Sequence, residues 1–161
     1  GRRRVKEYVA GAAAPVEKTL SLKATPERAF AHFTDNIAAW WPLASHSLSE
    51  GLARSVVFEA KAGGRIFEID AAGREREWGR VRDCEKPHRL VFSWLLENPA
   101  DATEVEVTFA PDGKGGTHFT LLHRGWRETK AAFGRRDMYD HGWLAVLGGY
   151  RATLEEGGRA P

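Results

Sequence analysis

The chain has 161 residues, of which 42% are hydrophobic and 29% charged, a composition typical of a globular protein with a single core. No apolar run approaches the roughly 20 residues of a membrane-spanning helix, and the formal charge of +2 comes from scattered basic residues, so we expect neither membrane insertion nor a nucleic-acid partner. The single Cys84 excludes an internal disulfide and is typical of a reducing compartment, which favours a cytoplasmic protein.

The chain begins with a segment that lacks a core pattern. Residues 1–16 are polar and then rich in small side chains, so we predict a flexible N-terminal tail there. No domain linker follows, and a single domain is therefore expected over residues 17–158. Its first strand is predicted at 17–24, where polar and apolar residues alternate.

Two short helices are predicted after this strand. Thr25 is suited to be an N-cap and Pro26 to be the first helical residue. A second helical segment is expected over residues 36–41. The following residues 42–54 are polar and rich in turn formers, so we predict a loop there.

Six further strands are predicted, because short alternating runs are separated by Gly, Pro, Asn and Asp. They cover residues 55–60, 65–70, 74–84, 89–97, 103–110 and 117–124. Strands at this spacing, with few helices between them, predict an antiparallel sheet of the α+β class.

Side-chain alternation assigns the inner face of two strands and leaves that of a third open. The two apolar faces are formed by Leu90, Phe92 and Trp94 and by Phe119, Leu121 and His123. In the strand at 74–84, Trp78 shares its side with arginines and Val81 lies on the other side. Alternation therefore does not decide which of its faces points inward.

A long final helix is predicted over residues 137–156. Its apolar stripe consists of Tyr139, Trp143, Val146, Leu147, Tyr150 and Leu154. We expect Asp137 to cap its first turn and the glycines 157 and 158 to end it. Gly148 and Gly149 each cost a helix interior about 1 kcal/mol relative to Ala, so a kink or a close backbone approach is expected there.

Several stretches occur together in an order that resembles a known superfamily. They are ATPERAFAHFTD (24–35), WWP (40–42), AGGRIFEI (62–69), WGRV (78–81), PHRLVFSW (87–94), GGTHFTLLHRGW (115–126) and HGWLAVLGGYRATLEE (141–156). The chain is similar over residues 17–156 to the START-like, Bet v-type (SRPBCC) superfamily, and within it to the bacterial-looking branch homologous to the activator of the heat-shock-protein-90 ATPase.

The resemblance implies a helix-grip fold. In this fold a curved seven-stranded antiparallel sheet surrounds a long C-terminal helix, two short helices follow the first strand, and a cavity lies between sheet and helix. The superfamily includes small-ligand carriers, polyketide cyclases, lipid-transfer domains and chaperone-activating domains. The fold alone therefore does not specify the function.

A cavity between a sheet and a helix is expected to be apolar, with a few polar groups. The predicted ligand-binding residues are Trp41, Phe92, Trp94, Phe119, Leu121, His123, Trp143, Leu147 and Tyr150. For each of them the alternative is plain core packing. Because Trp-rich walls suit flat ligands, we predict that the chain binds a small hydrophobic or aromatic molecule.

His123 is the candidate catalytic residue, because its side chain is expected to point toward the cavity near the final helix. There its imidazole could orient a ligand oxygen or move a proton, as in a polyketide cyclase or aromatase. The structural alternative is a buried histidine that is hydrogen-bonded to Tyr139 or Asp140. Whether the protein is an enzyme stays open at this point.

A third function is activation of a heat-shock ATPase, which would use the outer surface. The final helix has small residues on its outer face that leave room for a chaperone partner or a second copy of the chain: Ala145, Gly148, Gly149 and Ala152. No cofactor and no metal site are expected, because the chain has no His-Glu-x-x-His motif and no clustered cysteines.

Overall fold

The computed structural model describes residues 14–95, 102–127 and 130–159. Most of the predicted tail, residues 1–13, lies outside these ranges, as do the last two residues of the strand predicted at 89–97. The described elements are β1 (Val16–Leu22), α1 (Pro26–Thr34), α2 (Ile37–Trp40), the 3₁₀ turn η2 (Glu50–Leu52), β2 (Ala53–Phe58), β3 (Arg65–Asp70), β4 (Glu75–Glu85), β5 (Arg89–Trp94), β6 (Thr103–Pro111), β7 (Thr117–Arg124) and α3 (Lys130–Arg159).

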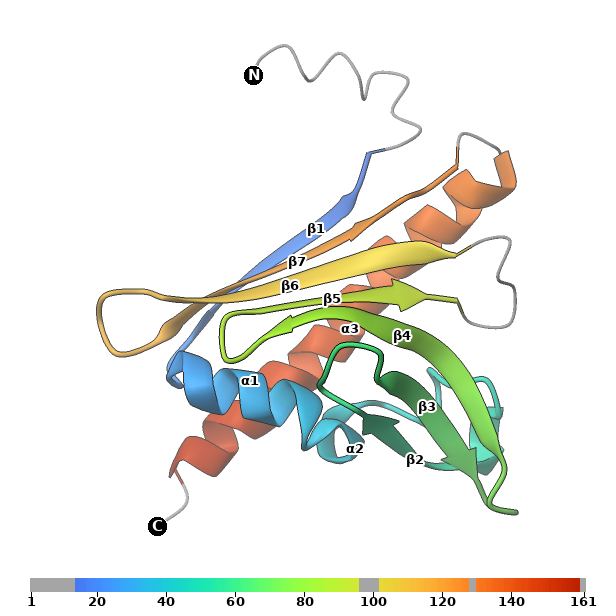
Figure 1. Ribbon diagram of the computed structural model, residues 1–161, viewed down its shortest axis with the longest axis horizontal. Coiled ribbons are helices and arrows are strands. Elements are labelled where there is room, and N and C mark those ends of the chain that lie inside the picture. The colour runs from blue at the N-terminus through green and yellow to red at the C-terminus, as the bar shows by residue number, and fades with distance from the viewer. Residues whose placement is uncertain (1–13, 96–101, 128–129, 160–161) are drawn as a thin grey trace.

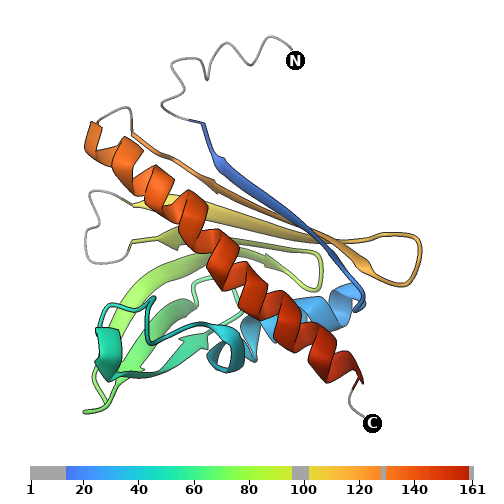
Figure 2. The ribbon, with the colours of Figure 1, turned by 180° about the vertical axis from the view of Figure 1, so that it is seen from behind.

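The described strands form one seven-stranded sheet in the order β1-β7-β6-β5-β4-β3-β2. Every neighbouring pair is antiparallel. The sheet curls, and α3 runs diagonally across its concave side, while α1 and α2 lie at one end between α3 and the sheet (Figures 1 and 2). The predicted α+β helix-grip fold is confirmed.

Local signals explain the start of α1. The Thr25 hydroxyl accepts a hydrogen bond from the Arg28 amide at 3.3 Å, and Pro26 is the first residue of the helix, as predicted. A second contact ties α1 to α3: the Tyr150 hydroxyl of α3 donates to the Ala29 carbonyl of α1 at 2.6 Å. Burial raises the pKa of Tyr150, which keeps this phenol a donor.

The final helix is longer than predicted. It begins at Lys130, so Asp137 is an exposed residue inside the helix and not its cap. The preceding residues include Ala and Arg, which are good helix formers, and Ala132 is buried against the protein. Gly148 and Gly149 both lie within α3, which is one continuous helix (Figure 2). A Cβ at Gly149 would lie 3.1 Å from the Trp40 carbonyl oxygen, so the predicted close approach occurs at this residue.

Strand β4 is irregular, which explains why alternation did not assign its faces. Ile66 pairs with Gly79 and Phe67 with Glu77, so Trp78 is an extra residue on β4. This bulge turns the Trp78 side chain into the core. The neighbouring Gly79 cannot carry a side chain, because a Cβ there would overlap the Ser93 carbonyl of β5.

Candidate ligand-binding site

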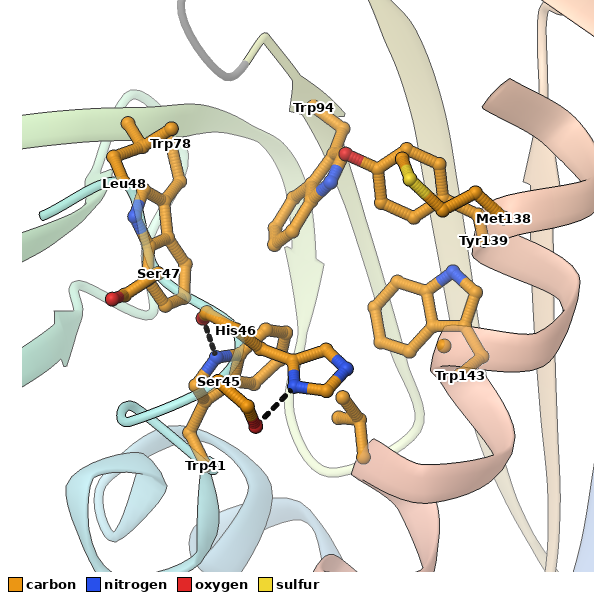
Figure 3. Close-up of a pocket in the computed structure, with 12 residues that line it drawn as sticks. Trp41, Ser45, His46, Ser47, Leu48, Trp78, Trp94, Met138, Tyr139 and Trp143 are labelled. Carbon is orange, nitrogen blue, oxygen red and sulfur yellow. Dashed lines mark hydrogen bonds between the residues drawn. The ribbon is translucent and has the colours of Figure 1, made fainter. Parts of the chain in front are cut away.

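A pocket of about 370 Å³ opens between α3, the inner face of β4 and β5, and the segment that follows α2 (Figure 3). The lining residues are Trp41, Ser45, His46, Ser47, Leu48, Trp78, Trp94, Met138, Tyr139, Gly142, Trp143 and Val146. They come from three parts of the chain that are far apart in sequence. Most of them are apolar or aromatic, and none is Asp, Glu, Lys or Arg.

Four indole rings form the wall of the pocket. The Trp41 ring centre lies 4.9 Å from that of Trp78 and 6.0 Å from those of Trp94 and Trp143. Trp78, Trp94 and Trp143 are buried, whereas Trp41 is half-buried beside the polar segment. These distances are in the range of attractive aromatic pairs, so the rings hold one another in place.

The segment over the pocket is held by a buried carboxylate. Glu68 is 0% exposed and accepts hydrogen bonds at 2.6 Å from the amides of Leu48 and Ser49 and from the Trp78 indole. Burial alone would raise the pKa of Glu68, but these hydrogen bonds outweigh it and lower the pKa below its ordinary value. The Glu68 carboxylate thus holds both the segment over the pocket, at Leu48 and Ser49, and the Trp78 ring in its wall.

His46 lies at the side of the pocket that faces α3. Its carbonyl accepts a hydrogen bond from the Trp41 indole at 2.7 Å, and its ring Nδ1 is 2.7 Å from the Ser45 hydroxyl. The opposite ring nitrogen, Nε2, would be 3.9 Å from a Cβ placed on Gly142. The imidazole therefore lies across from α3, with Nε2 turned toward the helix.

The indole N–H of Trp94 differs from those of the other three pocket tryptophans in its hydrogen bonding. It is buried and makes no hydrogen bond within the described part of the chain. The Tyr139 hydroxyl lies beside it (Figure 3), although the two groups lack hydrogen-bond geometry. Burial raises the pKa of Tyr139, and the neighbouring Trp94 N–H and the positive charge of Arg135 oppose this increase.

His123 lies behind the pocket and does not line it. The ring is 0% exposed, its Nδ1 accepts a hydrogen bond from the Trp143 indole at 3.0 Å, and its Nε2 lies 2.7 Å from the Thr103 hydroxyl. Because an indole N–H can only donate, Nε2 carries the ring proton and donates to Thr103. Burial lowers the pKa of His123 to about 3, so the ring is neutral.

These contacts of His123 favour the structural alternative. Both of its ring nitrogens are occupied inside the protein. The partners are not the predicted Tyr139 or Asp140, since Tyr139 makes only a ring contact with His123 and Asp140 is paired with Lys18 at 2.8 Å.

Of the nine predicted ligand-binding residues, three line the pocket: Trp41, Trp94 and Trp143. The other six are buried in the core away from it: Phe92, Phe119, Leu121, His123, Leu147 and Tyr150. Phe119 and Tyr150 pack around Phe33 of α1, which fills the space at that end of the sheet. The pocket lies elsewhere, between α3, β4, β5 and the segment that follows α2.

Several lining residues were not predicted. For some of them, the spacing of residues in the sequence already indicated a place on the pocket face of α3. Tyr139, Gly142, Trp143 and Val146 lie at positions i, i+3, i+4 and i+7 of α3, the spacing of a single helix face. Trp78 and residues 45–48 had no such signal, because a bulge and a distant carboxylate bring them to the pocket. Across the described ranges, no group of three or more His, Cys, Asp or Glu side chains is placed to hold a metal ion.

The fold and the pocket define a helix-grip protein with an internal cavity. The sequence profile of the family described as "Activator of Hsp90 ATPase homolog 1-like protein" matches residues 23–155. The chain belongs to this family, which confirms the resemblance seen in the sequence motifs. Among curated proteins no match was found.

Solved structures share the fold. An anthrahydroquino-gamma-pyrone synthase, Txn09, is 31% identical, with a TM-score of 0.59 over 86% of this chain and 96% of that one. The self-sacrificing resistance protein CalC from Micromonospora echinospora is 25% identical, with a TM-score of 0.69 over 93% and 99%. The Aha1 dimer from Colwellia psychrerythraea is 16% identical, with a TM-score of 0.66 over 88% and 96%, a likeness of fold alone.

No helix in the part of the chain that the structure describes is both long and apolar enough to cross a bilayer.

Proposed function

We propose that the protein binds a small, planar, aromatic molecule in the pocket between α3 and the sheet. The observation that carries this proposal is the convergence of four indole rings on one cavity of about 370 Å³. Such a volume is near the lower end of the roughly 300–1,000 Å³ found for small-molecule sites, so the ligand has a few fused rings. Indole faces attract flat aromatic molecules by stacking.

The lining favours an uncharged ligand. It contains no Asp, Glu, Lys or Arg that could pair with an ion, and burying an unpaired charge is costly. The similarity to Txn09, whose name specifies a fused aromatic product, supports the same class of molecule. The similarity to the resistance protein CalC shows that this scaffold also occurs in a protein that is not named as an enzyme.

Filling the pocket from α3 tests the proposal without removing a tryptophan. In Gly142→Leu the new side chain enters the pocket beside His46, so we expect the affinity for the planar probe xanthone to fall at least tenfold. Gly148→Leu is the matched control, because a Cβ at that residue meets nothing within 4 Å. Affinities are measured by isothermal titration calorimetry, with circular dichroism as a check of folding.

Two results would contradict the proposed binding function. If a panel of uncharged planar tricyclic probes fails to bind the unmodified protein, the proposal is wrong. It is also wrong if Gly142→Leu binds xanthone as tightly as Gly148→Leu does.

A second candidate is catalysis of a ring closure, favoured by the 31% identity to a gamma-pyrone synthase and by the imidazole of His46 in the pocket. A 2-hydroxyaryl 1,3-diketone closes to a gamma-pyrone when its phenol oxygen adds to the distal carbonyl and one water leaves. An imidazole can take the phenol proton and pass it to the carbonyl oxygen that is attacked, which gives a cyclic hemiketal. The resulting hydroxyl then leaves as water together with a proton from the neighbouring α-carbon, and the C=C bond of the pyrone forms.

The test uses 1-(2-hydroxyphenyl)-3-phenyl-1,3-propanedione, and the formation of flavone is followed by absorbance. If His46 transfers the proton, His46→Gln is expected to lower the rate by about 100-fold, while His118→Gln on the outer face of β7 leaves it unchanged. No acceleration over buffer by the unmodified protein would remove this candidate and leave binding intact. Activation of a heat-shock ATPase, a chaperone partner, a homodimer and a cytoplasmic location stay predictions.

A further inference from the structure

The four indole N–H groups around the pocket differ in whether they have a hydrogen-bond acceptor. Those of Trp41, Trp78 and Trp143 donate to the His46 carbonyl, the Glu68 carboxylate and His123 Nδ1, at 2.7, 2.6 and 3.0 Å. Among the described residues, the Trp94 N–H has no such acceptor, although the Trp94 side chain is only 5% exposed. A buried donor without an acceptor is uncommon and calls for a partner.

The Tyr139 hydroxyl lies beside this N–H (Figure 3). Figure 3 shows the phenol oxygen directed at the nitrogen side of the Trp94 ring. The Tyr139 ring is held by Trp126 and His123, with ring centres 5.7 and 5.1 Å away, so its orientation is set by packing. A phenol oxygen can accept one hydrogen bond and still donate its own proton.

We propose that the bound molecule carries a carbonyl oxygen that accepts a hydrogen bond from the Tyr139 hydroxyl, and that in this complex the phenol oxygen shifts into reach of the Trp94 N–H and accepts a hydrogen bond from it. This inference rests on the proposed function and names the substrate class, which is an uncharged aromatic ketone. Because Trp94 can only donate, its bond to Tyr139 directs the phenol proton toward the pocket. Burial raises the pKa of Tyr139, so the phenol keeps its proton and stays available as a donor.

Tyr139 is thus a specificity-determining residue and Trp94 positions it. A ligand with a carbonyl at this end should bind more tightly than its hydrocarbon analogue, since only the ketone uses the hydrogen bond. Trp94 donates to the Tyr139 oxygen, and Tyr139 donates to the ligand carbonyl, so the two hydrogen bonds form one chain. Their removal is therefore expected to be non-additive, as for any two groups in one hydrogen-bond network.

The experiment compares xanthone with xanthene, which has CH₂ in place of the carbonyl, by calorimetry. We expect xanthone to bind the unmodified protein about tenfold more tightly. Tyr139→Phe should abolish that preference, because xanthone loses the hydrogen bond and xanthene has none to lose. Trp94→Phe should reduce the preference several-fold, and the double variant should equal Tyr139→Phe. The control Trp143→Phe removes an N–H that is already bonded to His123, so it should weaken both probes alike.

A second readout is the carbonyl stretch of bound xanthone in the infrared spectrum. It should lie at lower frequency in the unmodified protein than in Tyr139→Phe, which a merely structural role of the tyrosine would not produce. Equal affinity for the two probes, or an unchanged preference in Tyr139→Phe, would overturn the inference while binding stands. Failure of both probes to bind would overturn the proposed function and the inference with it.

Discussion

Replacement of Glu68 by leucine is expected to lower the free energy of unfolding by about 4 kcal/mol and to release the segment over the pocket. The amides of Leu48 and Ser49 and the Trp78 indole would lose their common acceptor, each from a hydrogen bond of 2.6 Å. Unsatisfied donors of this kind cost about 1–3 kcal/mol each when they stay buried. Part of the cost is relieved if the segment moves into water.

Urea unfolding measures the loss of stability, and hydrogen exchange of the Leu48 and Ser49 amides measures the release. The control is Glu75→Leu, which removes an exposed carboxylate that pairs with Arg65 at 2.9 Å. Such a pair contributes at most about 1 kcal/mol. Unchanged protection of the two amides in Glu68→Leu would show that other contacts hold the segment.

The low pKa of Glu68 also sets the direction of its pH dependence. Because its folded-state pKa lies below the ordinary value of 4.5, its contribution to stability is present above about pH 4.5. It is lost as the pH falls through the lower folded-state pKa, when the carboxylate takes up a proton and can no longer accept all three bonds.

The second large effect is expected from His123. Its pKa is about 3 in the folded protein and close to 6.5 in the unfolded chain. Below pH 6.5 the unfolded chain therefore binds a proton that the folded protein does not, and stability falls as the pH falls. The loss amounts to about 4 kcal/mol by pH 3.5, of which about 2 kcal/mol is lost by pH 5, before Glu68 contributes.

His123→Gln is expected to be about 2 kcal/mol less stable at pH 7.5, because the Trp143 N–H and Thr103 lose a partner of fitting shape. Between pH 6.5 and 5 its stability should change much less with pH than that of the unmodified protein. Urea unfolding followed by circular dichroism across this range measures both effects. His118→Gln, on the same strand but exposed, should keep the original pH dependence. If the free energy of unfolding of His123→Gln depended on pH as steeply as that of the unmodified protein, the assignment of a neutral, buried imidazole to His123 would be wrong.

The strands and helices could largely be predicted from local patterns. The strand at 117–124 was predicted with its observed bounds, and Phe119, Leu121 and His123 face inward as alternation required. Thr25 and Pro26 start α1 because capping depends on neighbours in sequence. The start of α3 was wrong by seven residues, because good helix formers before Asp137 extend the helix where no cap was recognised.

The pocket was predicted only in part. Trp41, Trp94 and Trp143 line it, whereas Phe119, Tyr150 and the others are packed in the core. Every one of these residues is apolar or aromatic and points inward. Their patterns are therefore the same whether the space next to them is filled or empty.

The amino-acid sequence by itself determined most of the elements, the antiparallel arrangement of the strands and the inward faces of the strands at 89–97 and 117–124, because alternation, turn residues and caps act over a few neighbours. The tertiary structure alone decided where the hollow lies. A bulge turns Trp78 into it, and Glu68 holds an amide 20 residues away over it. A pocket is the volume that the packed side chains leave unfilled. That volume depends on residues from distant parts of the chain, so no local pattern in the sequence predicts it.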